Sequence, residues 1–325
     1  MRAAARIADE NQNKLTRMET MPMFLKKILN AAILCGGLFV LQALQAAPLQ
    51  DLKGKNVVLV HGAFADGSSW NKVIPLLEAR GLRVVSVQNP LSSLADDVAA
   101  TKRVVDQQTG PVVLVGHSWA GVVISEAGND SKVKNLVYVA AFAPDSGQSI
   151  EDMTKGEPAP PWASELQKDS AGYLTLSTKA VRADFAPDLP LPQQRLIAAT
   201  QGPWAAGCIG EKITTAAWHE KPSYFVVAAK DRMIDPHLRR AMAKNIGAHV
   251  TKVDSSHVAM LSRPDAVADT IIAGRKLRSE GDWRAGGCTR AAKPHPTDVP
   301  TSRLNKTSTR PAMRCNSLTS GSGRY

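Results

Sequence analysis

The sequence of 325 residues contains few cysteines and no cluster of metal-type ligands. Its four cysteines, Cys35, Cys208, Cys288 and Cys315, are far apart and show none of the paired spacings typical of zinc sites. The seven histidines show no such grouping with cysteine, aspartate or glutamate either, so we expect no metal and no other cofactor. Within the regularly patterned part of the chain we expect Cys208 to be free and buried. A Cys288–Cys315 disulfide is left open.

The middle of the sequence has little net charge, although the whole chain carries a formal charge of +11. Residues 1–27 hold six Lys/Arg against three Asp/Glu, and residues 281–325 hold eight against two. The two ends therefore carry +9 of the +11 and leave +2 for the remainder. A fold this close to neutral has no electrostatic reason to bind nucleic acid, so we expect no nucleic-acid partner.

The sequence also lacks an uninterrupted apolar run long enough to span a membrane. The longest candidate, residues 28–44, is interrupted by Asn30 and Gln42, whereas a spanning helix needs about 20 apolar residues. This segment follows the basic "MFLKK" and precedes the small-residue "QAAP", which is the order of a signal peptide. We expect cleavage after Ala46 or Ala47 and export to the periplasm or the medium. An uncleaved membrane anchor is the alternative.

Short apolar runs alternate with amphipathic segments between about residues 55 and 279. Such runs are typical of strands that are buried on both faces of a parallel sheet. We predict strands in residues 56–60, 82–88, 111–116 and 133–142, and two further strands, each together with the loop that follows it, in residues 223–232 and 248–257. We predict helices in residues 70–81, 94–110, 120–128, 236–247 and 263–280. The alternation indicates an α/β fold with a mostly parallel, doubly wound sheet.

The alternation is broken by a polar, proline-rich stretch at about residues 143–222. We expect this stretch to form a helical cap of short helices and loops, inserted before the strand at 223–232. The predicted organisation is therefore an extension with a signal peptide in residues 1–47 and an α/β domain in residues 48–280. Residues 281–325 are rich in Ser, Thr, Pro, Arg and Gly, and we expect a disordered basic tail there.

A serine, an aspartate and a histidine each follow a predicted strand. Ser118 stands in "VVLVGHSWAG", where a strand turns directly into a helix, Asp231 follows "YFVVAA", and His257 follows "HVTKV". The carboxyl ends of parallel strands meet at one edge of the sheet, where ligands bind in open α/β folds. A serine hydroxyl needs a base within reach and a carboxylate that orients the base. We therefore predict Ser118 as the nucleophile, His257 as the base and Asp231 as the acid.

Other acids and bases fit less well. Asp235 is four residues beyond Asp231 and remains an alternative acid, although its position suits the start of a helix. Asp254 stands at a strand end and suits a turn. His61 and His117 belong to the two turns of the predicted site, and we expect them to shape those turns rather than to act as bases.

Acyl transfer also needs hydrogen-bond donors for the developing oxyanion. The backbone N–H of Trp119, directly after the serine, is one predicted donor, and that of Ala63 in "LVHGAF" is the other. Apolar walls would suit an apolar acyl or alkyl group, with core packing as the alternative role for each aromatic residue. The predicted pocket residues are Phe64, Phe142, Trp162 and Trp204.

Four segments, "VVLVHGAFADGSSW", "VVLVGHSWAG", "AAKDRMIDP" and "SSHVAMLSRPDAVAD", occur in this order over roughly residues 55–275. They resemble the α/β-hydrolase superfamily. More narrowly, they are similar to its small-ester esterases and hydroxynitrile lyases, typified by plant methyl-salicylate esterases, and to related exported bacterial hydrolases. The resemblance implies Ser118, Asp231 and His257 as the catalytic triad. The lyases of this group carry a lysine directly after the catalytic histidine, where this chain has Val258, which disfavours cyanohydrin cleavage.

These observations predict a serine carboxylester hydrolase for small, apolar esters that works through an acyl-enzyme. The expected partner is a small-molecule ester. One alternative is a protein of the same fold that binds a small ligand without turning it over. The other alternative is a lyase that uses the same triad.

The turn around the serine departs from the usual G-x-S-x-G pattern, because its fifth position is Ala120 and glycine follows at Gly121. Residues that flank the nucleophile must be small, since strand and helix pack closely there. We predict that Ala120→Gly keeps its activity and that Ala120→Val loses most of it, measured as ester hydrolysis by the folded variants. A fully active valine variant would mean that the turn has been misassigned.

Overall fold

Apolar strands build a parallel sheet in the computed structural model, which describes residues 56–274. Within these residues the sheet has six strands, hydrogen-bonded in the order β2-β1-β3-β4-β8-β9. They are β1 (Asn56–Val60), β2 (Arg83–Val87), β3 (Val112–His117), β4 (Val133–Val139), β8 (Ser223–Ala228) and β9 (His249–Val253). Every residue of β1 and β3 is buried, because central strands of a parallel sheet are covered on both faces.

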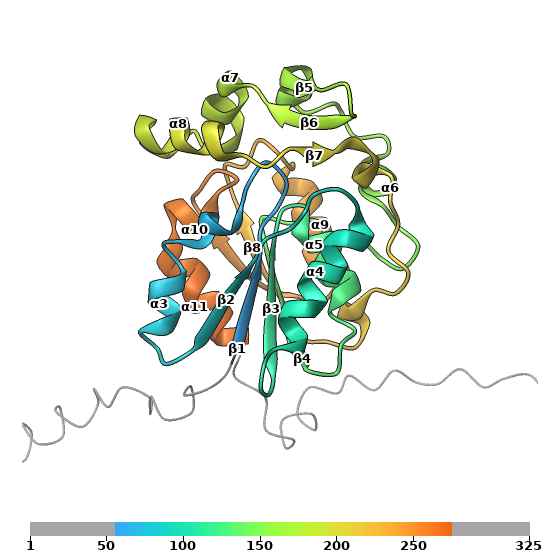
Figure 1. The fold of residues 1–325 in the computed structure, drawn as a ribbon, viewed down its shortest axis with the longest axis vertical. Helices are drawn as coiled ribbons and strands as arrows, with labels where there is room; N and C mark the ends of the chain where they lie inside the picture. Colours follow the sequence, from blue (N-terminus) through green and yellow to red (C-terminus); the bar gives the residue numbers. More distant parts are fainter. Residues whose placement is uncertain (1–55, 275–325) are drawn as a thin grey trace, which may run out of the picture. The chain divides into compact units, whose positions relative to one another are not determined.

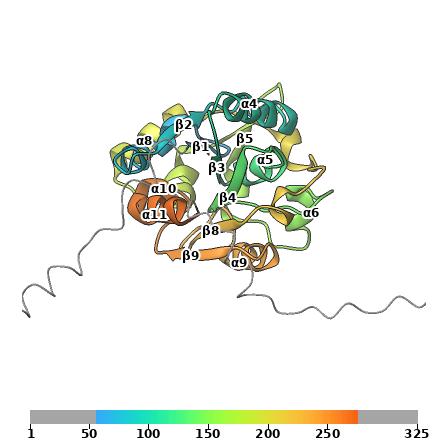
Figure 2. The same ribbon diagram turned by 90° about the horizontal axis from the view of Figure 1, so that it is seen from below.

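Helices cover the two faces of the sheet (Figure 2). One face carries α3 (Ile74–Glu78) and α11 (Pro264–Gly274), with the single-turn α10 (Ala259–Ser262) beside them. The other face carries α4 (Leu94–Asp106), α5 (Ala120–Ala127) and α9 (Pro236–Asn245). This arrangement confirms the predicted doubly wound α/β fold. In the strand order, β2 lies on one side of β1 and β3 lies on the other. The direction in which strands are added to the sheet therefore reverses between β1 and β3. Ligands bind at the carboxyl ends of the strands at such a switch point.

The helix predicted at residues 70–81 is shorter than expected. A 3-10 turn, η3 (Gly67–Trp70), comes first, and the Asp66 side chain caps it by accepting from the N–H of Ser68. Helix α3 then begins with Pro75 in its first turn, a position that needs no N–H donor. The chain stops being helical before Gly81, which has a left-handed φ of 80°.

A cap separates β4 from β8 and lies over the carboxyl ends of the strands (Figure 1). Its helical parts are α6 (Ile150–Thr154), η4 (Pro161–Glu165), α7 (Thr178–Ala180), η5 (Val181–Phe185), α8 (Leu191–Thr200), η6 (Ala206–Ile209) and η7 (Ala217–His219). The cap also contains an antiparallel sheet that we did not predict, made of β5 (Leu166–Lys168), β6 (Tyr173–Leu176) and β7 (Trp204–Ala205). Strands of two to four residues are too short to show an alternating pattern.

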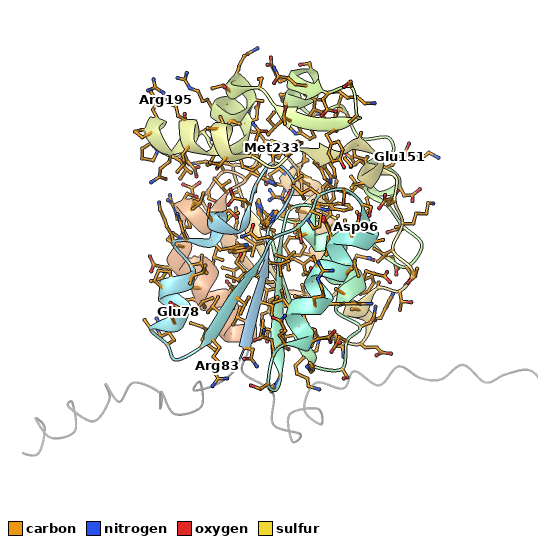
Figure 3. All side chains as sticks on the ribbon, in the orientation of Figure 1. Glu78, Arg83, Asp96, Glu151, Arg195 and Met233 are labelled. Carbon is orange, nitrogen blue, oxygen red and sulfur yellow. The ribbon has the colours of Figure 1, made fainter. Side chains whose placement is uncertain are left out.

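Two polar contacts join the cap to the loop that follows β8. The indole Nε1 of Trp162 donates to the carbonyl oxygen of Met233 at 2.9 Å. The guanidinium Nε of Arg232 donates to Asp184 at 2.6 Å, and the Asp184 side chain is almost fully buried. Met233 therefore lies at the junction of cap and sheet, as Figure 3 shows.

Some predictions fall outside residues 56–274, namely the signal peptide, the tail, and Cys35, Cys288 and Cys315. They stay predictions. Within the described residues Cys208 is buried and free, as expected. No helix between residues 56 and 274 is both long and apolar enough to cross a bilayer.

Candidate active site

Ser118 stands on a strained turn between β3 and α5. Its φ of 56° is left-handed, a conformation that costs a residue other than glycine about 1–3 kcal/mol. The surrounding backbone holds it there, because the Ser118 N–H donates to Val139 at 3.2 Å. The Ser118 carbonyl accepts from Gly121 at 3.0 Å and from Phe142 at 3.2 Å. The end of β4 thus supports the turn that presents the serine.

The small residues beside Ser118 stand where larger ones would collide with backbone. A Cβ atom on Gly116 would lie 2.6 Å from the carbonyl oxygen of Ala120, and a Cβ on Gly121 would overlap the carbonyl oxygen of Phe142. Ala120 itself is fully buried. Gly121 follows one place later than the glycine of the usual pattern. It must be glycine because the backbone of Phe142, after β4, comes so close to it.

His257 and Asp231 form a buried hydrogen-bonded pair. The Nδ1 atom of His257 lies 2.6 Å from Oδ2 of Asp231, and their side chains are 1% and 0% exposed. The other carboxylate oxygen of Asp231 accepts from the N–H groups of Met233 at 2.7 Å and Ile234 at 3.2 Å. With Nδ1–H donating to the carboxylate, Nε2 of His257 is left as a proton acceptor.

Arg239 is a partner of Asp231 that the sequence analysis did not identify. Its Nη1 atom lies 2.6 Å from Oδ2 of Asp231 as an ion pair, and both side chains are fully buried. The other terminal nitrogen donates to the carbonyl oxygen of Ala228 at 2.7 Å. A signal was available in the sequence, because Arg239, Met242 and Ala243 occupy one helical face of α9 and are its buried residues. An arginine on such an apolar face needs a buried anion.

These partners keep Asp231 ionised. Burial favours the neutral acid, but the charges of His257 and Arg239, together with hydrogen bonds from His257 and Met233, hold the pKa of Asp231 below its usual value. Burial also lowers the pKa of Arg239, and the neighbouring Asp231 opposes that change. The Asp231 carboxylate is therefore a negative charge that is buried away from water. Its immediate neighbours, His257 and Arg239, compensate it.

The loop that carries His257 is held from two sides. On the sheet side, Nε2 of His117 lies 3.1 Å from the carbonyl oxygen of His257. Burial, with a smaller contribution from His257, lowers the pKa of His117 well below its usual value, so the His117 ring is neutral. On the cap side, the N–H of Ser256 donates to Asp188 at 2.8 Å, and the Ser256 hydroxyl donates to the same carboxylate. His257 therefore lies between the cap and the sheet.

Ser118, Asp231 and His257 line one cavity of about 470 Å³ between the sheet edge and the cap. Ser118 is the most accessible of the three, at 9% exposed. Among the described residues, hydrogen bonds join His257 to Asp231 but not to Ser118. Nucleophile–base contacts of this kind are often loose in a site without substrate and tighten when it binds.

The two predicted oxyanion donors lie on the same cavity. Ala63 and Trp119 both line it, and within residues 56–274 neither backbone N–H donates a hydrogen bond to another residue. The loop of Ala63 comes close to the serine, because a Cβ on Gly62 would lie 2.7 Å from Cβ of Ser118. Two unused N–H groups beside the nucleophile are the arrangement that an oxyanion requires.

The cavity walls are mostly apolar and aromatic. Trp204 packs against Trp119 at 5.4 Å and against Phe64 at 5.8 Å between ring centroids. All four aromatic residues predicted for the pocket line the cavity, namely Phe64, Phe142, Trp162 and Trp204. The sequence analysis missed other apolar lining residues: Ile150, Phe185, Met233, Ile234 and Leu238. Such walls suit an apolar substrate group.

The alternative acids have other roles. Asp235 lines the cavity but caps α9, accepting from the N–H of His237 at 2.6 Å. Asp254 is exposed and pairs with Lys230 at 2.8 Å. Neither residue has a hydrogen bond to His257 in the part of the chain that the structure describes.

A second buried carboxylate stands behind Trp119. The Trp119 indole Nε1 donates to Asp97 at 2.7 Å, and the Leu91 N–H donates to its other oxygen at 2.8 Å. Burial is the main cause that raises the pKa of Asp97 to about 6, although these two hydrogen bonds oppose the rise. The sequence could have indicated that Asp97 is buried, because this acid stands on the apolar face of α4, beside Leu94 and Val98. Asp97 anchors the side chain whose backbone N–H faces the cavity.

Within residues 56–274, no group of three or more His, Cys, Asp or Glu side chains could hold a metal ion. What the described residues bring together is a serine, a histidine–carboxylate pair and two unused N–H groups on one apolar cavity. This set can transfer a proton and stabilise an oxyanion.

Comparison with known proteins finds relatives over about two thirds of this chain. A sequence model described as the alpha/beta hydrolase family matches residues 57–270. The alpha-hydroxynitrile lyase of Arabidopsis thaliana is 26% identical over 245 residues, which cover 66% of this chain and 95% of the relative. Methylesterase 2 of Arabidopsis thaliana is 27% identical over 260 residues, which cover 69% of this chain and 97% of the relative.

The fold has solved counterparts. The extracellular alpha/beta-hydrolase from a Paenibacillus species superposes with a TM-score of 0.59 at 20% identity, and the match covers 67% of this chain and 98% of the other. At that identity the likeness shows the fold alone. Together, these matches confirm the resemblance drawn from the four sequence segments.

We predict that Arg239→Gln lowers the free energy of unfolding by about 3–5 kcal/mol at pH 7, because it leaves a buried carboxylate without its ion-pair partner. Urea denaturation of the purified protein measures the change. Arg240→Gln is the matched control, since Arg240 is exposed and adjacent, and its effect should stay within about 0.5 kcal/mol. Equal losses in the two variants would show that the Arg239–Asp231 pair has no special role.

Asp97 should make stability depend on pH. The fold raises the pKa of Asp97 to about 6. The contribution of Asp97 to the free energy of unfolding is therefore fully present below the usual aspartate pKa and is lost as the pH rises through about 6. Asp97→Asn removes this titration. Between about pH 4 and pH 7, the stability of this variant relative to wild type should therefore rise, by up to about 3 kcal/mol.

The control for this prediction is the adjacent Asp96, which is exposed (Figure 3). Hydrogen bonds from Ser92 and Ser93 lower the pKa of Asp96. The stability of Asp96→Asn relative to wild type should therefore fall as the pH rises to about 5 and stay level from there to about pH 7. Denaturation curves at each pH measure both variants, and parallel curves for Asp97→Asn and wild type would contradict the prediction.

Proposed function

The chain belongs to the alpha/beta hydrolase family, and we propose that it is a serine carboxylesterase for small, apolar esters. One observation carries the proposal. Ser118, on its strained turn, lines the same cavity as the buried His257–Asp231 pair. Esterases and a lyase of this family align over most of their own length with the chain, and the residues around His257 favour the esterase.

In the proposed acylation, Nε2 of His257 takes the hydroxyl proton of Ser118 as Oγ attacks the ester carbonyl carbon. The carbonyl oxygen becomes an oxyanion and accepts from the backbone N–H groups of Ala63 and Trp119, each of which contributes about 3–4 kcal/mol to barrier lowering. The bond to the alcohol oxygen then breaks, and His257 returns the proton to that oxygen. The alcohol leaves, and the acyl group stays on Ser118.

Deacylation repeats these steps with water. His257 takes a proton from water, the hydroxide attacks the acyl carbon, and the same two N–H groups bind the second oxyanion. When the bond to Oγ breaks, His257 returns the proton to Ser118 and a carboxylic acid is released. Throughout, Asp231 keeps Nδ1–H oriented and stabilises the charged ring.

The surroundings of His257 argue against cyanohydrin cleavage. The residue after His257 is Val258, which is apolar and 1% exposed, and it offers no charge to a departing cyanide. Among the described residues, the Lys or Arg side chain that lines the cavity is Arg232, and Asp184 of the cap holds it at 2.6 Å. The aromatic and aliphatic walls instead favour neutral acyl and alkyl groups.

We predict that the full-length protein hydrolyses p-nitrophenyl esters of short acids. Ser118→Ala should lower kcat/KM at least about 10³-fold, because loss of the nucleophile leaves only binding and oxyanion stabilisation. Ser164→Ala, an exposed serine of η4 in the cap, is the control and should match wild type.

The same proteins discriminate between the alternatives. Wild type should react with a fluorophosphonate serine probe, and Ser118→Ala should not. A folded wild-type protein that neither reacts with the probe nor hydrolyses the esters would favour a binding protein. Cyanohydrin cleavage above the rate of Ser118→Ala, without ester hydrolysis, would favour a lyase.

A further inference from the structure

The cavity of about 470 Å³ that Ser118 lines is called the reaction cavity below. A second cavity, of about 240 Å³, shares Phe64 and Phe185 with it. Its apolar part is formed by buried or half-buried side chains: Ala65, Ile197, Val258, Met260 and Leu261. Its polar part contains exposed or half-buried side chains: Asp66, Ser68, Ser69, Asn71, Lys72 and Gln193. The cavity therefore runs from solvent, between α8 and the η3 loop, to the two phenylalanines that also line the cavity of Ser118.

Both phenylalanines stand on unusual backbone. Phe64 has a left-handed φ of 58°, which is a strained conformation for a bulky residue. Phe185 ends the π-helix η5, where the N–H of Ala186 donates to Val181 at 2.9 Å. Strained residues and π-helical turns are concentrated at functional sites. Two such features on the wall between two cavities indicate a role in binding.

The proposed reaction places the leaving alcohol beside this wall. The alcohol oxygen must lie close to Nε2 of His257, which protonates it. The Phe185 ring contacts the His257 ring edge-on at 5.2 Å, and the next residue, Val258, lines the second cavity. The position from which the alcohol leaves is therefore next to Phe185 and Val258.

We propose that the second cavity binds the alcohol part of the ester, which enters it when the Phe185 side chain turns aside. This inference rests on the proposed esterase function. The occupant is a neutral, apolar alcohol group of the size of a benzyl ring, because a cavity of about 150 Å³ is enough to hold benzene. The reaction cavity then holds the acyl part, between Trp119, Trp162 and Trp204.

The charge at the entrance favours a neutral occupant. Lys72 is the cation on this cavity among the described residues, and its Nζ already donates to the carbonyl oxygen of Leu261 at 3.0 Å. It also donates to Gln193 at 3.5 Å, which joins the η3 loop side to α8. Asp66, which also lines the cavity, is negative. Within residues 56–274, a carboxylate on the alcohol would meet in this cavity no Lys or Arg that lacks a hydrogen-bond partner.

The test compares two esters of one acid, methyl butyrate and benzyl butyrate, with the full-length protein. Ile197→Trp fills the second cavity and leaves the reaction cavity unchanged. It should lower kcat/KM for the benzyl ester at least 10-fold and change that of the methyl ester less than 2-fold. Arg195→Trp on the same helix is the control, because Arg195 is exposed and lies outside the cavity lining (Figure 3). It should change neither ester.

Two further measurements keep the test decisive. Benzyl alcohol should inhibit wild type as a product and should inhibit Ile197→Trp at least 5-fold more weakly. If Ile197→Trp does not fold, Thr200→Trp blocks the same cavity from the next turn of α8.

A folded blocking variant that hydrolyses both esters at wild-type rates, or loses both equally, would overturn the inference and leave the esterase function standing. If wild type hydrolyses neither ester and does not react with the serine probe, the proposed function fails, and this inference fails with it.

Discussion

The carboxylate of Asp231 is a charge placed where water cannot reach it, and the candidate active site is built from the groups that compensate this charge. A buried charge is tolerated only when it is paired and hydrogen-bonded. Here the partners are His257 from the loop after β9, Arg239 from α9, and two N–H groups of the Asp231 loop itself. The requirement therefore ties β8, α9 and β9 together, and the orientation of His257 follows from it.

The cap belongs to the same system of supports. Asp188 in the cap accepts from Ser256, directly before His257, and Trp162 donates to Met233 in the Asp231 loop. The segments that close the cavity above are thus bonded to the loops that carry Asp231 and His257. Because of these bonds, a change in the cap can alter the positions of these two side chains as well as the cavity shape.

Strain at the site is held by ordinary backbone hydrogen bonds and close packing. Ser118 and Phe64 both have left-handed φ values. Near Ser118, Gly116 and Gly121 lie so close to neighbouring backbone that no side chain would fit there. Members of one fold family carry out different reactions, so the chemistry must be argued from such local features. In this chain these features include the apolar Val258, directly after His257, and the Phe185 ring beside it.

The amino-acid sequence by itself determined the alternation of strands and helices, and with it the strand ends that carry Ser118, Asp231 and His257. These features depend on local patterns of apolar residues, which a linear sequence displays directly. Only the tertiary structure decided the partners of Arg239 and Asp97, the short strands β5–β7 and the second cavity. A buried charge on an apolar helix face shows that a partner is needed, but not which one. That choice depends on packing between elements far apart in the chain.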